Sequence, residues 1–79
     1  MKTLEWRHLK PACMAMWERE QNHGCWKGGE IPPIMYEIRD TYYPSLKDDD
    51  MWLGVIEAVV KTNAVNAIGK VGGLRPVQR

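Results

Sequence analysis

The longest stretch of regularly spaced apolar residues runs from about Asp49 to about Val71, and it constrains the fold more than any other feature. Its apolar residues recur every three or four positions, which is the period of an α-helix. Trp52, Val55 and Val59 widen this apolar face in its first half. We therefore expect one long helix whose wide face is covered by the rest of the chain or by a second subunit. The main apolar set is Leu53, Ile56, Val60, Ala64, Ala67, Ile68 and Val71.

Both ends of this helix carry sequence signals. Asp48, Asp49 and Asp50 place negative charge where the helix dipole is positive, and one of these side chains can cap the first turn. The acidic triplet lacks the alternating acids, the glycine and the closing glutamate of a calcium-binding loop. Capping is therefore the favoured interpretation. Gly72 and Gly73 are expected to end the helix.

Two further helices are expected earlier in the chain. The first begins at Pro11, a favoured first position, and stops near Gly24, with Leu9, Cys13, Met16 and Trp17 on its buried face. The second covers residues 32–43, where apolar residues recur at helical spacing. A strand is the alternative there, because Ile34, Tyr36 and Ile38 also alternate.

The first residues follow a different pattern. Residues 2–8 place Leu4, Trp6 and His8 on one side and polar residues on the other, which predicts a short strand or an extended arm. A helix start capped by Thr3 is the competing interpretation. The predicted fold class is therefore mainly α, a small three-helix domain with an N-terminal extended arm or strand and one long C-terminal helix.

Length limits this fold to one domain with a thin core. The chain has 79 residues, and a chain of this size buries only roughly 60% of the surface of its unfolded form. We expect a single helical domain over residues 1–73 and a flexible basic tail over residues 74–79. The helical part and the tail are the only units that the sequence suggests.

Charge is nearly balanced over the whole chain but uneven along it. The formal net charge is +1, so no global field draws the chain to nucleic acid or to a membrane. Residues 30–60 carry seven negative and two positive groups, whereas residues 61–79 carry four positive groups and no negative one. The acidic middle and the basic end are therefore expected to face different partners or each other.

Few residues suggest chemistry. A zinc site would need His8, Cys13, His23 and Cys25, but a His-x-Cys pair is too tight for a usual zinc knuckle. Cys25 and His23 lie too close in sequence to form a nucleophile–base pair, and the only serine, Ser45, has no histidine near it. We expect no catalytic site, no metal and no cofactor.

Location is predicted from what the sequence lacks. Charged residues interrupt the start of the chain, so no secretory signal is recognisable, and no apolar run approaches the roughly 20 residues of a membrane span. The predicted location is the cytoplasm. Cys13 and Cys25 would be reduced there rather than joined in a disulfide.

The aromatic residues suggest protein binding. Trp and Tyr are enriched at protein interfaces, and the chain has four Trp, three Tyr and no Phe. The favoured hypothesis is a non-enzymatic protein-binding module, a small bacterial or phage-encoded regulator or inhibitor that binds a host protein, and a homodimer is a further expectation. Its expected surface combines the aromatic residues Trp6, Trp26, Tyr36, Tyr42 and Tyr43 with Asp40 and Asp48 at the rim. Trp6 and Trp26 could instead fold back over the core.

Nucleic-acid binding is the alternative function. The last helix and the tail present a polar and basic strip, as a recognition helix requires. Seven acidic residues in the middle of the chain and a pI near 7.8 argue against it. The strip consists of Lys61, Asn63, Asn66, Lys70, Arg75 and Arg79.

Overall fold

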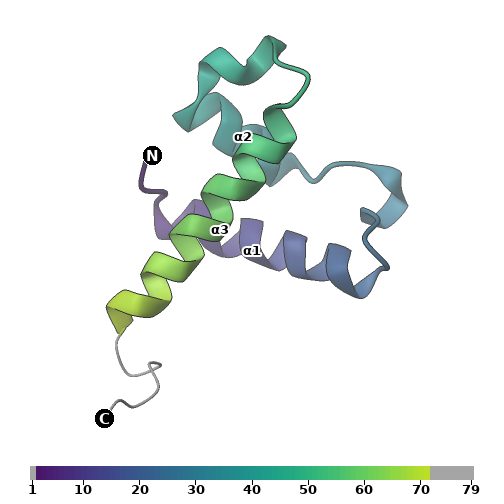
Figure 1. Cartoon of the computed structure of the whole chain (residues 1–79). Coiled ribbons are helices and arrows are strands. Elements are labelled where there is room, and N and C mark those ends of the chain that lie inside the picture. The colour runs from purple at the N-terminus through teal and green to yellow at the C-terminus, as the bar shows by residue number, and fades with distance from the viewer. Residues whose placement is uncertain (1, 72–79) are drawn as a thin grey trace.

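Three α-helices and two short 3-10 helices make up the fold (Figure 1). The computed structural model describes residues 2–71, and the side chains of residues 2–67. The three-helix prediction is confirmed, and no strand occurs in residues 2–71. The predicted helix end at Gly72 and the basic tail over 74–79 lie outside the described residues. The elements are α1 (Trp6–Gln21), η1 (Lys27–Gly29), α2 (Pro33–Tyr42), η2 (Pro44–Asp48) and α3 (Trp52–Val71).

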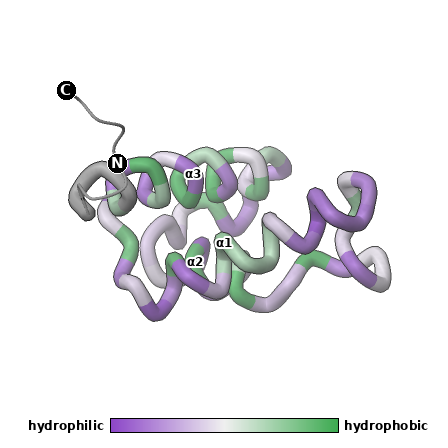
Figure 2. Tube along the Cα trace, turned by 90° about the horizontal axis from the view of Figure 1, so that it is seen from below, coloured by the Kyte–Doolittle hydropathy of each residue, from purple (hydrophilic) through white to green (hydrophobic). Residues whose placement is uncertain are grey.

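The long last helix lies across the other two. All three pairs of α-helices are in contact, and Figure 2 shows α3 on one side with α1 and α2 on the other. The core lies between these two layers, and it contains residues from all three helices and from the N-terminal residues that precede them. Its buried apolar side chains are Leu4, Leu9, Ala12, Met16, Met35, Ile38, Ile56, Val59 and Val60.

The first helix begins earlier than predicted. It starts at Trp6, directly after Glu5, and Pro11 lies inside it instead of opening it. Neither a strand over residues 2–8 nor a cap by Thr3 is present. Within residues 2–8, residues 2–5 precede the helix and the others belong to it. Burial of His8, Leu9 and Ala12 on one helical face outweighs the preference of the residue before proline for extended angles.

Helix α1 also turns a different face to the core than predicted. Trp17 was expected inside, but its side chain is 59% exposed. The buried face is centred near Ala12, and Trp17 is five residues further, which rotates it by about 140° around the helix. Cys13, at the edge of the buried face, is half-buried.

The end of α1 is tied to α3 and to the following loop. His23 and Gly24 adopt left-handed backbone angles, with φ of 60° and 83°, and the Gly24 N–H donates to the Arg19 carbonyl. The Arg19 guanidinium donates two hydrogen bonds to Glu57 of α3, at 2.5 and 3.1 Å. These bonds raise the pKa of Arg19, and the Trp26 ring covers its guanidinium at 4.4 Å.

Residues 33–42 form a helix, so the strand alternative for this segment is wrong. Pro33 opens α2 at a position where a missing N–H has no cost. Met35 and Ile38 are fully buried, and Arg39 is 8% exposed. Its guanidinium lies 4.6 Å from the Trp52 ring and 5.3 Å from the Tyr36 ring. Cation–π contacts therefore join α2 to the start of α3.

Helix α3 begins at Trp52, within one turn of the predicted start near Asp49. Of the acidic triplet, Asp49 forms the hydrogen bonds at the helix start. Its side chain accepts the Met51 N–H at 2.8 Å, and its backbone carbonyl accepts the Trp52 N–H at 3.1 Å. Residues 44–48 form a 3-10 helix before this turn. The carboxylate of Asp49 thus satisfies a backbone donor at the entry of the helix, as expected from the sequence.

Candidate functional site

An open groove lies between the start of the chain and the second half of α3. It encloses about 570 Å³. The largest exposed side chains along it are Trp6, 64% exposed, and Val65, 67% exposed. Its lining consists of Thr3, Leu4, Trp6, Asn63, Val65, Asn66 and Ala67, and we refer to it below as the groove.

One side of the groove is formed by residues 2–5, which we call the arm, and Asn63 fixes the arm to α3. The Asn63 Oδ1 accepts the Leu4 N–H at 2.8 Å, and its Nδ2 donates to the Lys2 carbonyl at 3.3 Å. Nδ2 also donates to the Val59 carbonyl at 2.8 Å. Because Asn63 is only 8% exposed, these bonds are shielded from water.

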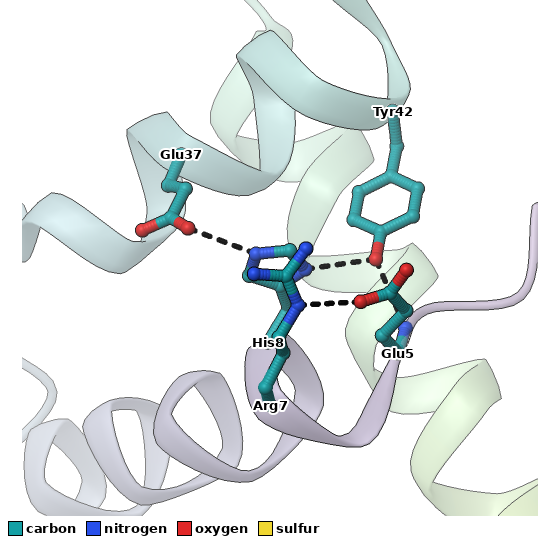
Figure 3. A network of polar contacts seen from close by, with 5 residues as sticks. All are labelled: Glu5, Arg7, His8, Glu37 and Tyr42. Atoms are coloured by element: carbon teal, nitrogen blue, oxygen red, sulfur yellow. Dashed lines mark hydrogen bonds and ion pairs between the residues drawn. The ribbon is translucent and has the colours of Figure 1, made fainter.

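A second set of contacts fixes the arm and the start of α1 to α2. The Tyr42 hydroxyl accepts the Glu5 N–H at 3.0 Å and bonds the His8 Nδ1 at 2.8 Å (Figure 3). The other ring nitrogen of His8, Nε2, bonds the Glu37 carboxylate at 2.8 Å. The Tyr43 hydroxyl in turn accepts the Lys2 N–H at 2.8 Å. Glu37 and Tyr42 of α2, together with Tyr43 directly after it, therefore hold the residues on either side of Trp6.

Carboxylate, imidazole and hydroxyl form a continuous chain here, which is also the order of groups in hydrolytic triads. His8 is 3% exposed, and the Tyr42 hydroxyl is already bonded to the Glu5 backbone. The hydroxyl bonds both the Glu5 backbone and the His8 ring, so this chain of groups joins the arm, α1 and α2. Beside it, the exposed Arg7 guanidinium donates a hydrogen bond to the Glu5 carboxylate. This bond lowers the pKa of the Glu5 carboxyl.

The aromatic residues predicted to form one partner surface are separated in the fold. Trp6 lies at the groove, whereas Trp26 is half-buried against Arg19 near the opposite end of α1. Tyr36 is 40% exposed and packs on Trp52, with ring centroids 5.0 Å apart. Tyr42 and Tyr43 are half-buried and bonded to the arm. The structure therefore places only Trp6 of this set at the groove.

The acidic residues predicted at the rim lie elsewhere. Asp40 accepts a hydrogen bond from the Arg39 Nε at 3.0 Å, and it does not line the groove. Asp48 is exposed at the end of η2. Neither residue borders Trp6 in the way that the sequence suggested.

The predicted nucleic-acid strip loses one member. Asn63 was expected on the exposed side of α3, but it is buried because its side chain bonds the arm. Lys61 and Asn66 are exposed and border a shallow hollow of about 250 Å³. The Lys70 side chain, Arg75 and Arg79 lie outside the described residues.

The sequence did not predict that Val65 lines the groove. Val65 belongs neither to the main apolar set of the long helix nor to the residues that widen it, and that position indicated an exposed side chain. The sequence could not show that the arm approaches Val65, because sixty residues separate them. The surface predicted from aromatic content therefore includes Trp6 but not Val65.

The residues considered for metal binding and thiol chemistry are separated from one another or are free. No group of three or more His, Cys, Asp or Glu residues in that part of the chain could hold a metal ion. Cys13 and Cys25 are free, and burial raises the pKa of the Cys13 thiol. A higher pKa lowers the fraction of reactive thiolate at neutral pH.

Comparisons with known protein families, with curated proteins and with solved structures find no match for this chain. Among the described residues, none of the helices is both long enough and apolar enough to cross a membrane.

Proposed function

We propose that this chain is a non-enzymatic protein-binding module that uses the groove to hold an apolar side chain of another protein. The observation that carries this proposal is the exposure of Trp6 and Val65 along one groove. Such a module regulates or inhibits its partner by occupying a surface of that partner. Its expected contact surface is Trp6 with Val65 and the exposed arm residue Thr3.

The energetics favour Trp6 as the anchor. A tryptophan side chain covers roughly 150–250 Å² when it is buried, and burial of apolar area contributes about 25 cal/mol per Å². Covering the exposed part of Trp6 would therefore stabilise a complex by roughly 2–4 kcal/mol. The arm is already fixed by Asn63 and Tyr42, so little conformational entropy is lost when a partner binds.

Two exposed tryptophans on the same helix provide a matched test. Trp6 lines the groove, whereas Trp17 is similarly exposed but does not line it. We expect Trp6→Ala to abolish capture of the partner protein from extracts of the organism that encodes the chain, and Trp17→Ala to leave capture unchanged. Quantitative mass spectrometry of the captured proteins measures both effects.

The opposite results contradict the proposal. If both variants lose capture equally, the contact lies on the exposed side of α1. If neither variant loses capture, the groove is not the binding surface. Binding that falls steeply with salt and disappears after nuclease treatment would instead support a nucleic-acid partner. Lys61 and Asn66 are the described residues that such a partner would contact.

We also propose that the protein acts in the cytoplasm. The two cysteines are unpaired in the structure, which fits a reducing compartment. Mass spectrometry of protein from cells that are lysed in denaturant with an alkylating reagent should find both thiols modified and no disulfide between them.

A further inference from the structure

The arm is held by its main chain and not only by its side chains. Three of the four backbone N–H groups of residues 2–5 donate to side-chain oxygen atoms that lie 37 to 59 positions away in the sequence. Figure 3 shows the Tyr42 hydroxyl directed at Glu5. Main-chain hydrogen bonds to an extended segment are a common mode of peptide recognition. The three side chains that accept these bonds form what we call the arm site, which consists of Tyr42, Tyr43 and Asn63.

Asn63 binds the arm through both ends of its amide. Its Oδ1 accepts the Leu4 N–H at 2.8 Å, and its Nδ2 donates to the Lys2 carbonyl at 3.3 Å. In an extended chain these two backbone groups point to the same side, so one amide bonds both. Asn63 is 8% exposed, and its Nδ2 also donates to the Val59 carbonyl of its own helix. This bond within α3 fixes the amide, and the arm site therefore selects an extended backbone.

Two side chains of the arm give this site a preference in sequence. Leu4 is 5% exposed and belongs to the hydrophobic core. The Lys2 ammonium donates to the Tyr42 carbonyl at the end of α2, where the helix dipole favours a positive charge. It also lies 5.3 Å from the centroid of the Tyr43 ring. Thr3, between these two residues, is exposed. The matching ligand is therefore an extended segment in which lysine is followed two positions later by leucine.

The arm is attached to its own helix mainly by the covalent chain. Glu5, the residue directly before α1, forms no side-chain cap bond. Among the described residues, the hydrogen bonds of residues 2–4 run to Tyr42, Tyr43 and Asn63, and none runs to α1. The groups that recognise the arm thus belong to α2, to the residue after it and to α3. An equivalent segment of another chain would form the same contacts at this site.

We propose that the arm site is a peptide-binding site, where an extended segment of another protein, with lysine followed two positions later by leucine, replaces the arm. The arm is then a built-in competitor of that segment. The apparent affinity for the segment is reduced to the fraction of chains whose arm has left the site. This proposal goes beyond the groove, because the arm site uses neither Trp6 nor Val65.

A short peptide tests the arm site in the full chain. The probe is acetyl-Lys-Thr-Leu-Glu-amide, which keeps every main-chain group that the site contacts, and two-dimensional NMR of the 15N-labelled chain follows its binding. We expect the Leu4 N–H signal of the chain to move to the position of an unbonded amide. The same peptide with serine in place of leucine should bind at least about tenfold more weakly. Equal binding of both peptides, or binding that leaves the Leu4 signal unchanged, overturns the proposal.

Lys2→Ala tests the competition between arm and peptide. Lys2 is exposed, so its removal weakens the arm without opening the core. The apparent dissociation constant of the peptide should fall by about tenfold, because the competitor loses a charge-assisted hydrogen bond and a cation–π contact. Lys10→Ala removes the same charge at an exposed position of α1 and should leave the constant unchanged. An unchanged constant in Lys2→Ala, or no binding of the peptide to that variant at millimolar concentration, overturns the proposal.

Leu4→Ala gives a second measurement, which a loss of stability does not prevent. The variant should have a lower Tm, and the peptide should raise this Tm because it supplies the missing leucine side chain. Leu9→Ala also removes a buried leucine, but from α1, and the peptide should raise its Tm much less. Equal effects of the peptide on both variants would overturn the proposal. Absence of peptide binding together with retained capture through Trp6 would overturn the arm-site proposal alone.

Discussion

At the scale of single residues, Tyr42 has the most connected hydroxyl of the described polar contacts. It lies on the last turn of α2, accepts the backbone N–H of Glu5 and bonds the imidazole of His8. The rings of His8 and Tyr42 also meet edge to face, with centroids 5.4 Å apart. One oxygen atom therefore joins the arm, α1 and α2 (Figure 3).

Removal of this oxygen should destabilise the fold. Tyr42→Phe leaves the Glu5 N–H and the His8 Nδ1 without their partner, and we expect a loss of about 1–2 kcal/mol in the free energy of unfolding. Urea denaturation followed by tryptophan fluorescence measures this change. Tyr36→Phe is the control on the same helix, because Tyr36 is more exposed and packs through its ring. Its effect should stay within about 0.5 kcal/mol.

At the scale of elements, α1 tolerates a proline in its interior. Pro11 is the sixth residue of the helix and cannot donate a hydrogen bond to the Arg7 carbonyl one turn before it. The side chain of Pro11 is exposed, so it contributes no core contact that would offset this loss. Helix α1 nevertheless forms because its inner face buries Leu9, Ala12 and Met16 against the other helices.

Pro11→Ala should therefore stabilise the protein. The substitution restores a backbone hydrogen bond and removes the clash of the ring with the preceding turn, and we expect a gain of about 1–3 kcal/mol. The larger conformational freedom of alanine in the unfolded chain reduces the gain. Thermal denaturation measures it as a higher Tm. Pro33→Ala, at the first position of α2, should give no gain, and an equal gain there would contradict the explanation.

At the scale of the whole molecule, the core is a single small cluster. Its fully buried large side chains, Met35, Ile38, Ile56 and Val60, lie where α2 and α3 cross. Between Met16 and Met35, which includes the last turn of α1 and the loop that follows, no residue is buried. Stability is therefore concentrated at one crossing of helices, and it decreases toward the loop over residues 22–32.

Hydrogen exchange should reproduce this gradient. We expect the backbone amides of residues 56–60 and 35–38 to exchange slowest, because their opening requires the core to separate. Amides of residues 24–30 should exchange fastest within the described chain, since that loop is exposed and forms few backbone bonds. Mass spectrometry of exchanged protein resolves these segments. Slow exchange in the loop would show that another surface covers it.

The groove shows how far sequence reasoning reaches at this scale. Trp6, which was predicted as a contact residue, is exposed at the groove. Tyr42 and Asn63 were assigned to two different binding surfaces, yet both hold the arm. Residue type alone does not distinguish a polar group that binds a partner from one that bonds its own chain. The distinction depends on two contacts between distant parts of the chain. Glu5 and Tyr42 lie 37 positions apart, and Leu4 and Asn63 lie 59 positions apart.

The sequence by itself determined the three helices and the long apolar segment from 49 to 71, because hydrophobic period, proline and glycine positions and capping residues act over a few neighbouring residues. Tertiary structure decided the start of α1 at Trp6, the exposure of Trp17 and the burial of Asn63. It also decided which side of α3 stays uncovered. These features depend on burial and hydrogen bonds between distant segments, whose free energies exceed the local preferences that a sequence displays.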